Sequence, residues 1–454
     1  MNQRPTVTKH STTAGQPRVA SRRVVRNQAP VASNVTRLAD RRPAQRKPAA
    51  AGVRTSVNDR FSDLLGRFLA FVERVFSGQS LLFMLTAAVA VILAIFGVIM
   101  VLSASSIQSI RETGGPFSYA WRQGLFAIIG VVFLMIASLI PVSTYMRFAG
   151  MFFAISCVLQ AYAVFFGLNV NGNREWINLG PFTIQPGEFL KLAVILMMAT
   201  HYQRFQGQEW NYKIYGWRSL IYVAIGAFLI IIGNDMGTTM VLGMIALLVL
   251  WLSEVPGIAM RIPVGLALLA VLYGLWGSAS RRARIDAWLN PGTDDQANNL
   301  VWQSMHGVWA LANSNGIGRG LGMSNLKWSW IPEVQNDYIF AIIGEELGFA
   351  GAVLTVLLFG LLGYLILQIA LRARDLFSRM VCYGVAGWFV IQAVINIAVV
   401  LTLLPVLGVP LPLVSYGGSS LITGLAAVGV VLSIERRNHE ELDGGSRGRL
   451  RARR

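Results

Sequence analysis

Residues 380–434 read MVCYGVAGWFVIQAVINIAVVLTLLPVLGVPLPLVSYGGSSLITGLAAVGVVLSI and contain no Asp, Glu, Lys or Arg. Further uncharged runs cover residues 80–110, 123–146, 148–173, 236–253 and 347–371. A helix that crosses a bilayer needs about 20 mainly apolar residues, and these runs are continuously apolar, whereas the strands of a membrane barrel alternate. Since lipid satisfies no backbone polar group, the runs predict helices, and the expected fold class is an all-α polytopic membrane protein.

We expect about ten transmembrane helices, at approximately residues 81–103, 119–140, 147–168, 188–203, 217–234, 236–253, 258–277, 338–367, 379–404 and 415–434. Basic residues in the connecting loops predict that both chain ends lie in the cytoplasm, because Lys and Arg are retained on that side. This scheme defines a membrane domain at 80–434 and places a large extracytoplasmic loop, residues 278–337, between the seventh and eighth helices.

The composition and the charge distribution fit this scheme. The chain is 54% hydrophobic and 13% charged, whereas a soluble protein of this size carries about 25% charge. The net charge of +17 comes mostly from two tails: residues 1–79 hold 15 basic and 4 acidic residues, and residues 435–454 hold 7 and 4. We interpret residues 1–79 as a disordered basic cytoplasmic tail and 435–454 as a second basic tail. Their charge is typical of a topology signal or of attraction to anionic lipid or a partner protein, and not of nucleic-acid binding.

No cofactor motif is recognisable in the sequence. Cys157 and Cys382 fall within apolar runs, where cysteine is a packing residue, and the four histidines show no ligand spacing. The sequence therefore identifies no metal site, although a divalent cation is left open.

The predicted outer loop is long for a membrane protein, and long loops tend to be functional. It mixes amide, acidic and basic side chains with the tryptophans Trp288, Trp302, Trp309, Trp328 and Trp330. Tryptophan is enriched at membrane interfaces, so this loop is predicted to lie on the headgroups. The alternative is an inert re-entrant cap.

Polar residues interrupt the apolar runs on the predicted outer side. The segment 171–180 (NGNREWINLG) carries Arg174 and is followed by 185–191 (QPGEFLK), in which Glu188 and Lys191 stand three residues apart and can pair on one helix face. Asp235 lies in a tight break between two spans. The functional interpretation is a substrate site. The alternatives are a charge pair that eases burial and, for Asp235, a helix cap.

Two more segments carry candidate residues. Asp337 and Glu345 lie at helical spacing on one face, which points either into a cavity or toward structural ion-pair partners. The segment 411–420 (LPLVSYGGSS) contains Ser415 and Ser419, and its prolines and glycines must expose backbone groups that line a cavity or are buried in protein. The glycine-rich segment 316–322 is a weak phosphate-loop signal without a Walker sequence.

These segments, in this order, resemble the SEDS family (shape, elongation, division and sporulation), most closely its division member and next its elongation member. The strings 336–348 (NDYIFAIIGEELG) and 412–420 (PLVSYGGSS) carry the resemblance, together with Gln185-Pro186 and Lys327-Trp328. It extends over residues 80–436. It implies ten spans and a peptidoglycan glycosyltransferase that polymerises lipid II on the outer face of the inner membrane at the division septum. Its implied partners are a class B penicillin-binding protein and, through the tails, other division proteins.

The resemblance also implies site residues. The family's loop aspartate, which would act as general base, corresponds to Asp294, but the residues after it depart from the family pattern and leave Asp295 as a competitor. Arg174, Lys191, Arg319 and Lys327 are candidates for the pyrophosphate. The expected substrate-binding set is Arg174, Glu188, Lys191, Asp235, Gln303, Lys327, Asp337, Glu345, Ser415 and Ser419.

Two other functions fit a polytopic protein of this kind. A transporter of lipid-linked precursors should show related broken helices in its two halves, and no clear repeat is visible. A non-catalytic division scaffold would act through its tails.

Overall fold

The computed structural model describes residues 57–170, 172–180, 182–206, 218–252, 257–276, 279–290, 298–314, 316–325 and 334–452. Contacts divide the chain into Met1–Phe61, of which 57–61 are described, and Ser62–Arg454. The helices are α1 (Val57–Phe76), α2 (Leu81–Thr113), α3 (Ser118–Leu139), α4 (Val142–Phe166), α5 (Pro186–Arg204), α6 (Arg218–Ile232), α7 (Met236–Leu252), α8 (Gly257–Trp276), α9 (Ala279–Leu289), α10 (Asn298–Ala312), α11 (Ile339–Arg372), α12 (Leu376–Val400) and α13 (Gly418–Ala452).

The predicted helical membrane fold is confirmed. Among the described residues, six helices are long and apolar enough to cross a membrane: α2, α3, α4, α11, α12 and residues 418–442 of α13. Shorter apolar helices occupy Ser219–Ile232, Met236–Leu252 and Met260–Leu269. They and α5 coincide with the remaining expected spans, while the count of ten crossings stays a prediction.

Two local features differ from the sequence prediction. A small antiparallel sheet, β1 (Leu168–Val170), β2 (Asn173–Asn178) and β3 (Thr183–Ile184), connects α4 to α5. Gly172 and Gly180 adopt positive φ angles at its turns, which glycine allows at no steric cost. The prediction that residues 1–79 are disordered is wrong for 57–76, which form α1, because apolar residues recur there at helical spacing. Residues 1–56 lie outside the described part.

The long uncharged segment 380–434 forms most of α12, the non-helical connection that follows it, and the first part of α13. Between α12 and α13 the chain leaves helical geometry over residues 401–417, and Leu411, Leu413 and Val414 are nearly inaccessible. A Cβ on Gly97 of α2 would lie 2.7 Å from the carbonyl oxygen of Leu413, so the missing side chain admits this segment. Residues 411–415 of the non-helical segment are thus enclosed by protein, as a membrane interior requires.

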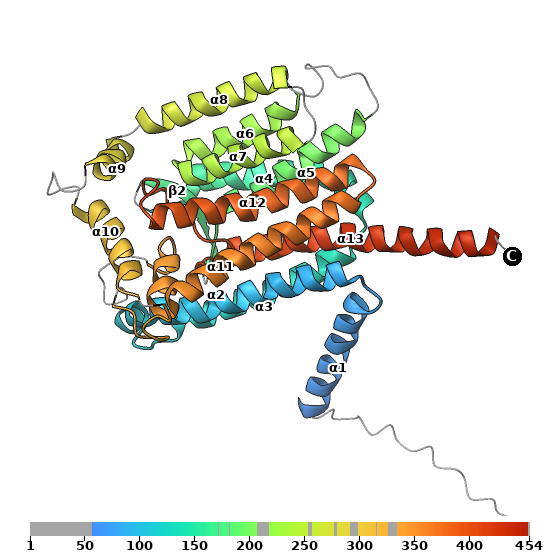
Figure 1. The fold of residues 1–454 in the computed structure, drawn as a ribbon, viewed down its shortest axis with the longest axis horizontal. Coiled ribbons are helices and arrows are strands. Elements are labelled where there is room, and N and C mark those ends of the chain that lie inside the picture. The colour runs from blue at the N-terminus through green and yellow to red at the C-terminus, as the bar shows by residue number, and fades with distance from the viewer. Residues whose placement is uncertain are drawn as a thin grey trace, which may run out of the picture. The chain divides into compact units, whose positions relative to one another are not determined.

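The remaining helices pack around this region. Helix α13 lies along α3 and α2, and α12 lies between α11, α5 and α7 (Figure 1). Strand β2, α9 and α10 lie at one end of the bundle, which we call the loop end, and the C-terminal part of α13 projects from the opposite end, the tail end. The expected large loop therefore contains two helices at the same end as the small sheet.

Candidate functional site

A cavity of about 1510 Å³ opens near the loop end. One wall is apolar and comes from α6, α7 and α8, with residues such as Ile221, Met240 and Leu266. The polar part comes from connecting segments, and its charged lining residues are Arg122, Glu175, Asp235, Arg284 and Asp337. The cavity therefore joins an apolar surface to a charged end.

The backbone brings Glu175 next to Asp235. Asn234 has a φ of 65° at the break between α6 and α7, a left-handed conformation that asparagine tolerates. Its side chain donates to the carbonyl oxygen of Gly172 at 3.0 Å, and the Arg174 amide donates to the Gly233 carbonyl at 3.0 Å. These two hydrogen bonds dock strand β2 on the helix break.

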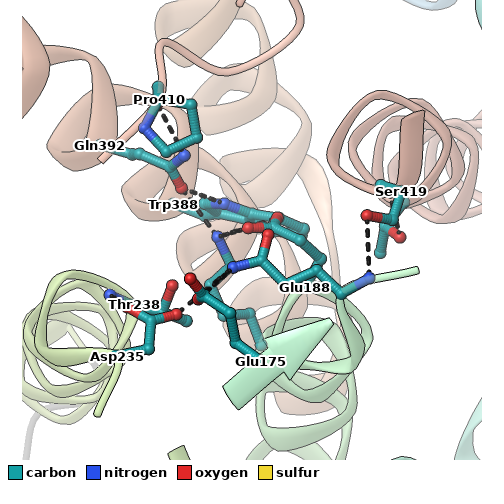
Figure 2. Close-up of polar contacts among 11 residues, drawn as sticks. Glu175, Glu188, Asp235, Thr238, Trp388, Gln392, Pro410 and Ser419 are labelled. Carbon is teal, nitrogen blue, oxygen red and sulfur yellow. Dashed lines mark hydrogen bonds and ion pairs between the residues drawn. The ribbon is translucent and has the colours of Figure 1, made fainter. Parts of the chain in front are cut away.

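The side chains of Glu175 and Asp235 lie next to one another (Figure 2). Gln185 bridges the two carboxyl groups: its Nε2 donates to Oε2 of Glu175 at 2.9 Å and to Oδ2 of Asp235 at 3.3 Å. The other oxygen of Asp235 accepts from the Thr238 amide at 2.9 Å and caps α7, so the predicted cap is formed. Asp235 thus has one oxygen in the helix cap and one in the carboxyl pair.

The environment of Glu175 favours its protonated form. Burial is the largest cause, the negative charge of Asp235 and a hydrogen bond with it come next, and Asp337 adds a smaller repulsion. Together they raise the pKa of Glu175 to about 10. Glu175 is therefore protonated at neutral pH. In the described part of the chain no ion pair involves Glu175 or Asp235.

The structure separates the remaining candidates. Asp235, Gln303 and Asp337 line the cavity. Glu188 and Lys191 form the predicted pair, but each side chain is 1% exposed and neither lines the cavity. The Lys191 ammonium lies 3.0 Å from Glu188, 2.9 Å from Oε1 of Gln392 and 4.6 Å from the centre of the Trp388 ring. This sealed cluster matches the alternative of a charge pair that eases burial.

Glu345 does not line the cavity either. It accepts from the Ser324 hydroxyl at 2.5 Å and the Asn325 amide at 3.0 Å, and Arg319 lies 3.7 Å away. The neighbouring Glu346 binds the Ser103 hydroxyl at 2.6 Å. The amides of Arg319 and Gly320 donate to the carbonyl oxygens of Glu345 and Glu346 and hold the glycine-rich segment on α11. A Cβ on Gly318 would collide with the backbone of Glu346, so this glycine serves close packing.

The remaining serines and cations have positioning or surface roles. The Ser415 hydroxyl donates to the Asn336 carbonyl at 2.5 Å and accepts from the Leu411 amide, and Ser419 accepts from the Gln185 amide at 3.2 Å. Arg174 is exposed and does not line the cavity. Asp294, Asp295 and Lys327 lie outside the described residues.

Three charged residues of the cavity were not selected from the sequence. Glu175 follows Arg174 in the segment 171–180. An acidic residue between two apolar runs could have identified it as a candidate site residue. Arg122 interrupts an apolar helix, and Arg284 belongs to the long loop, where its guanidinium donates to the Val406 carbonyl at 3.3 Å. Within the described ranges, no group of three His, Cys, Asp or Glu side chains is arranged to hold a metal ion.

Comparisons with known proteins extend over nearly all of the membrane domain. Residues 83–440 match the family model for FtsW, RodA and SpoVE, described as cell cycle proteins. Stage V sporulation protein E of Bacillus subtilis is 36% identical over 357 residues, which are 78% of this chain and 96% of that protein. The probable peptidoglycan glycosyltransferase FtsW of Trichlorobacter lovleyi is 33% identical over 349 residues, 76% of this chain and 90% of the relative.

Solved structures support the fold. A chain of a peptidoglycan synthase complex, described as coordinating polymerization and crosslinking, superposes with a TM-score of 0.64 at 24% identity and covers 80% of this chain and 99% of its own length. The motifs, the helical membrane architecture and the match across residues 83–440 agree, and the chain belongs to the FtsW/RodA/SpoVE (SEDS) family of membrane proteins.

Proposed function

We propose that this protein is a peptidoglycan glycosyltransferase that polymerises lipid II into glycan strands at the outer face of the cytoplasmic membrane during septal wall synthesis. Family membership and the FtsW relatives support the activity. The observation that carries the proposal is that an apolar wall and a charged end lie in the same cavity. Lipid II combines a polyprenyl chain with a sugar pyrophosphate, so it needs both kinds of surface in one place.

In the proposed reaction, the 4-hydroxyl of one lipid-linked disaccharide attacks the anomeric carbon of another. The bond from that carbon to the pyrophosphate oxygen breaks, and undecaprenyl pyrophosphate leaves. A carboxylate must take the proton of the attacking hydroxyl, as in inverting glycoside chemistry. We assign this role to Asp294, with Asp295 as the alternative.

The cavity residues have complementary roles in this scheme. Asp235 accepts hydrogen bonds from sugar hydroxyls, and the neutral Glu175 donates one, because a carboxylic acid is both donor and acceptor. Arg122 and Arg284 are the basic residues among the described cavity lining, and guanidinium groups bind phosphate oxygens bidentately. We therefore assign the leaving pyrophosphate to these two arginines before Arg174, Lys191, Arg319 or Lys327.

This function requires the loop end to face outward and both chain termini to lie in the cytoplasm. The excess of Lys and Arg in segments 1–79 and 435–454 supports that orientation, because basic flanking segments are retained in the cytoplasm. The related chain from a complex that coordinates polymerization and crosslinking supports a penicillin-binding transpeptidase of class B as partner. Septal placement rests on the resemblance to the division member.

The test is glycan chain formation from lipid II by the purified protein in liposomes, with its transpeptidase partner present and lipid II on the accessible side. Wild-type protein should form polymer without any transport step, and the folded Asp294→Asn/Asp295→Asn double variant should not. Transport of lipid II without polymer would favour a flippase. Full activity of the double variant would remove the loop aspartates from the mechanism while leaving the polymerase intact.

A further inference from the structure

Helix α1 has a strongly two-sided sequence. Apolar residues recur at intervals of three and four, which places them on one face of the helix. These residues are Phe61, Leu64, Leu65, Phe68, Leu69, Phe71, Val72, Val75 and Phe76. The helix also carries three arginines and three acidic residues within 20 residues, and it is not among the helices apolar enough to cross a membrane. Such a composition is typical of a helix that lies in a membrane interface.

The arginines of α1 are regularly placed. Arg60, Arg67 and Arg74 are seven residues apart, about two helical turns, so their positions form one row along the edge of the apolar face. The acidic positions 59 and 73 lie farther round the polar side, whereas position 63, three residues after Arg60 and four before Arg67, borders the row. A row of arginines beside an apolar face lets the side-chain stems cover apolar surface while the guanidinium groups reach phosphate.

The C-terminal part of α1 is packed against the membrane helices. Val75 is fully buried, Phe71, Val72 and Phe76 pack against the hydrophobic core, and the ring centroids of Phe76 and Phe83, in the first turn of α2, lie 5.8 Å apart in a T-shaped contact. The Arg436 guanidinium of α13 donates to the Val75 carbonyl at 2.8 Å. These contacts hold the end of α1 where α2 begins, only residues 77–80 apart.

One side of the apolar face is open. Leu69 is 57% exposed and Arg67 and Arg74 are exposed, whereas Phe71 and Val72 are half-buried against the core. The apolar face therefore continues away from a fixed point at the entrance of the first predicted span. The surface available at that level is the headgroup region of the cytoplasmic leaflet. The net positive charge of residues 1–79 favours an anionic one.

We propose that α1 binds the anionic cytoplasmic surface of the membrane, with its apolar face in the headgroup boundary and the row of Arg60, Arg67 and Arg74 on lipid phosphates. The partner is a phospholipid surface, and the inference does not depend on the proposed enzymatic function.

The test uses the full-length protein in nanodiscs that contain anionic phospholipid, with Cys157→Ala and Cys382→Ala as background. A spin label is attached to Leu69→Cys, on the open side of the apolar face, or to Ala70→Cys, the exposed matched control on the polar side. Accessibility is measured to oxygen, which concentrates in lipid, and to a water-soluble nickel chelate. We expect the oxygen-to-nickel accessibility ratio to be several-fold higher at 69 than at 70.

Two results would overturn the proposal. Equal, high nickel accessibility at both positions would mean that α1 lies in water. Protection of position 69 from both agents would mean that a protein, either a partner or a second copy, covers the face. The charge assignment is tested by repeating the measurement in zwitterionic nanodiscs and with Arg67→Gln/Arg74→Gln, both of which should lower the ratio at 69. An unchanged ratio in both would refute the role of the arginines.

Discussion

Two pairs of polar residues near the start of α5 use similar groups in opposite ways. Glu188 is sealed from solvent beside the Lys191 ammonium, which Gln392 and Trp388 also contact. Glu175 and Asp235 face the cavity, where the neutral amide of Gln185 donates to both and neither has an ion-pair partner among the described residues. The sealed pair compensates its own charge, whereas the cavity pair has no cation of its own and the pKa of Glu175 is raised. The comparison separates carboxyl groups that stabilise the fold from those that we propose to contact the substrate.

The largest expected effect comes from breaking the sealed pair. Lys191→Met leaves Glu188 as a buried charge without its cation and should lower the free energy of unfolding by about 3–5 kcal/mol. Chemical unfolding in detergent measures this loss. The double variant Glu188→Gln/Lys191→Met should recover most of it, and a Lys191→Met protein as stable as wild type would show that the pair is not structural.

The cavity pair should respond in activity instead. Asp235→Asn preserves an oxygen that can cap α7 but removes the charge, so stability should change little. Polymerisation of lipid II should fall by about 10- to 100-fold, because a hydrogen bond to a charged group contributes about 1.5–3 kcal/mol and each 1.4 kcal/mol is about tenfold. Thermal unfolding of the same sample is the control, and activity within twofold of wild type would separate Asp235 from the reaction.

The protonation of Glu175 should make the stability of the protein depend on pH. The pKa of this carboxyl is 4.5 in an unfolded chain and about 10 in the folded protein, so the folded state binds the proton more tightly. Its contribution to stability is complete below the lower value and is lost as pH rises toward the upper one. Glu175→Gln lacks this loss, and its melting temperature should exceed that of wild type by a margin that widens between about pH 5 and about pH 9. A constant margin would contradict the assigned protonation.

The smallest effect is expected at the tail end. Arg437 pairs with Asp375 and lies 3.7 Å from Glu441, but its side chain is 31% exposed. Solvent weakens such pairs, so Arg437→Ala should cost at most about 1 kcal/mol in unfolding experiments and leave polymerisation unchanged. A loss comparable to that of Lys191→Met would mean that exposure does not distinguish the two pairs.

Local patterns in the sequence were sufficient for several of these features. Continuous apolar runs predicted the helices, the spacing of Glu188 and Lys191 predicted their pairing, and the position of Asp235 predicted its cap. Each of these depends on residues within a few positions of one another. The helix α1 was missed because the basic composition of the tail outweighed its local periodicity.

The cavity could not be predicted in the same way. Glu175 and Asp235 meet because Asn234 docks strand β2 on the α6–α7 break, a tertiary contact between segments 60 residues apart. Arg122 and Arg284 converge from α3 and α9 for the same kind of reason. Conversely, Lys191 and Glu345 carried promising charges, and only the packing of neighbouring helices determined that both are buried away from the cavity.

The central claim is that lipid II occupies this cavity. It is tested by placing a photo-crosslinking amino acid at Phe182, which lines the cavity and is 43% exposed, or at Phe349, which is 72% exposed and does not line it. After irradiation with labelled lipid II, we predict a crosslink at position 182 that unlabelled lipid II competes away and little specific labelling at 349. No competable crosslink at 182, or equal labelling at both positions, would contradict the account.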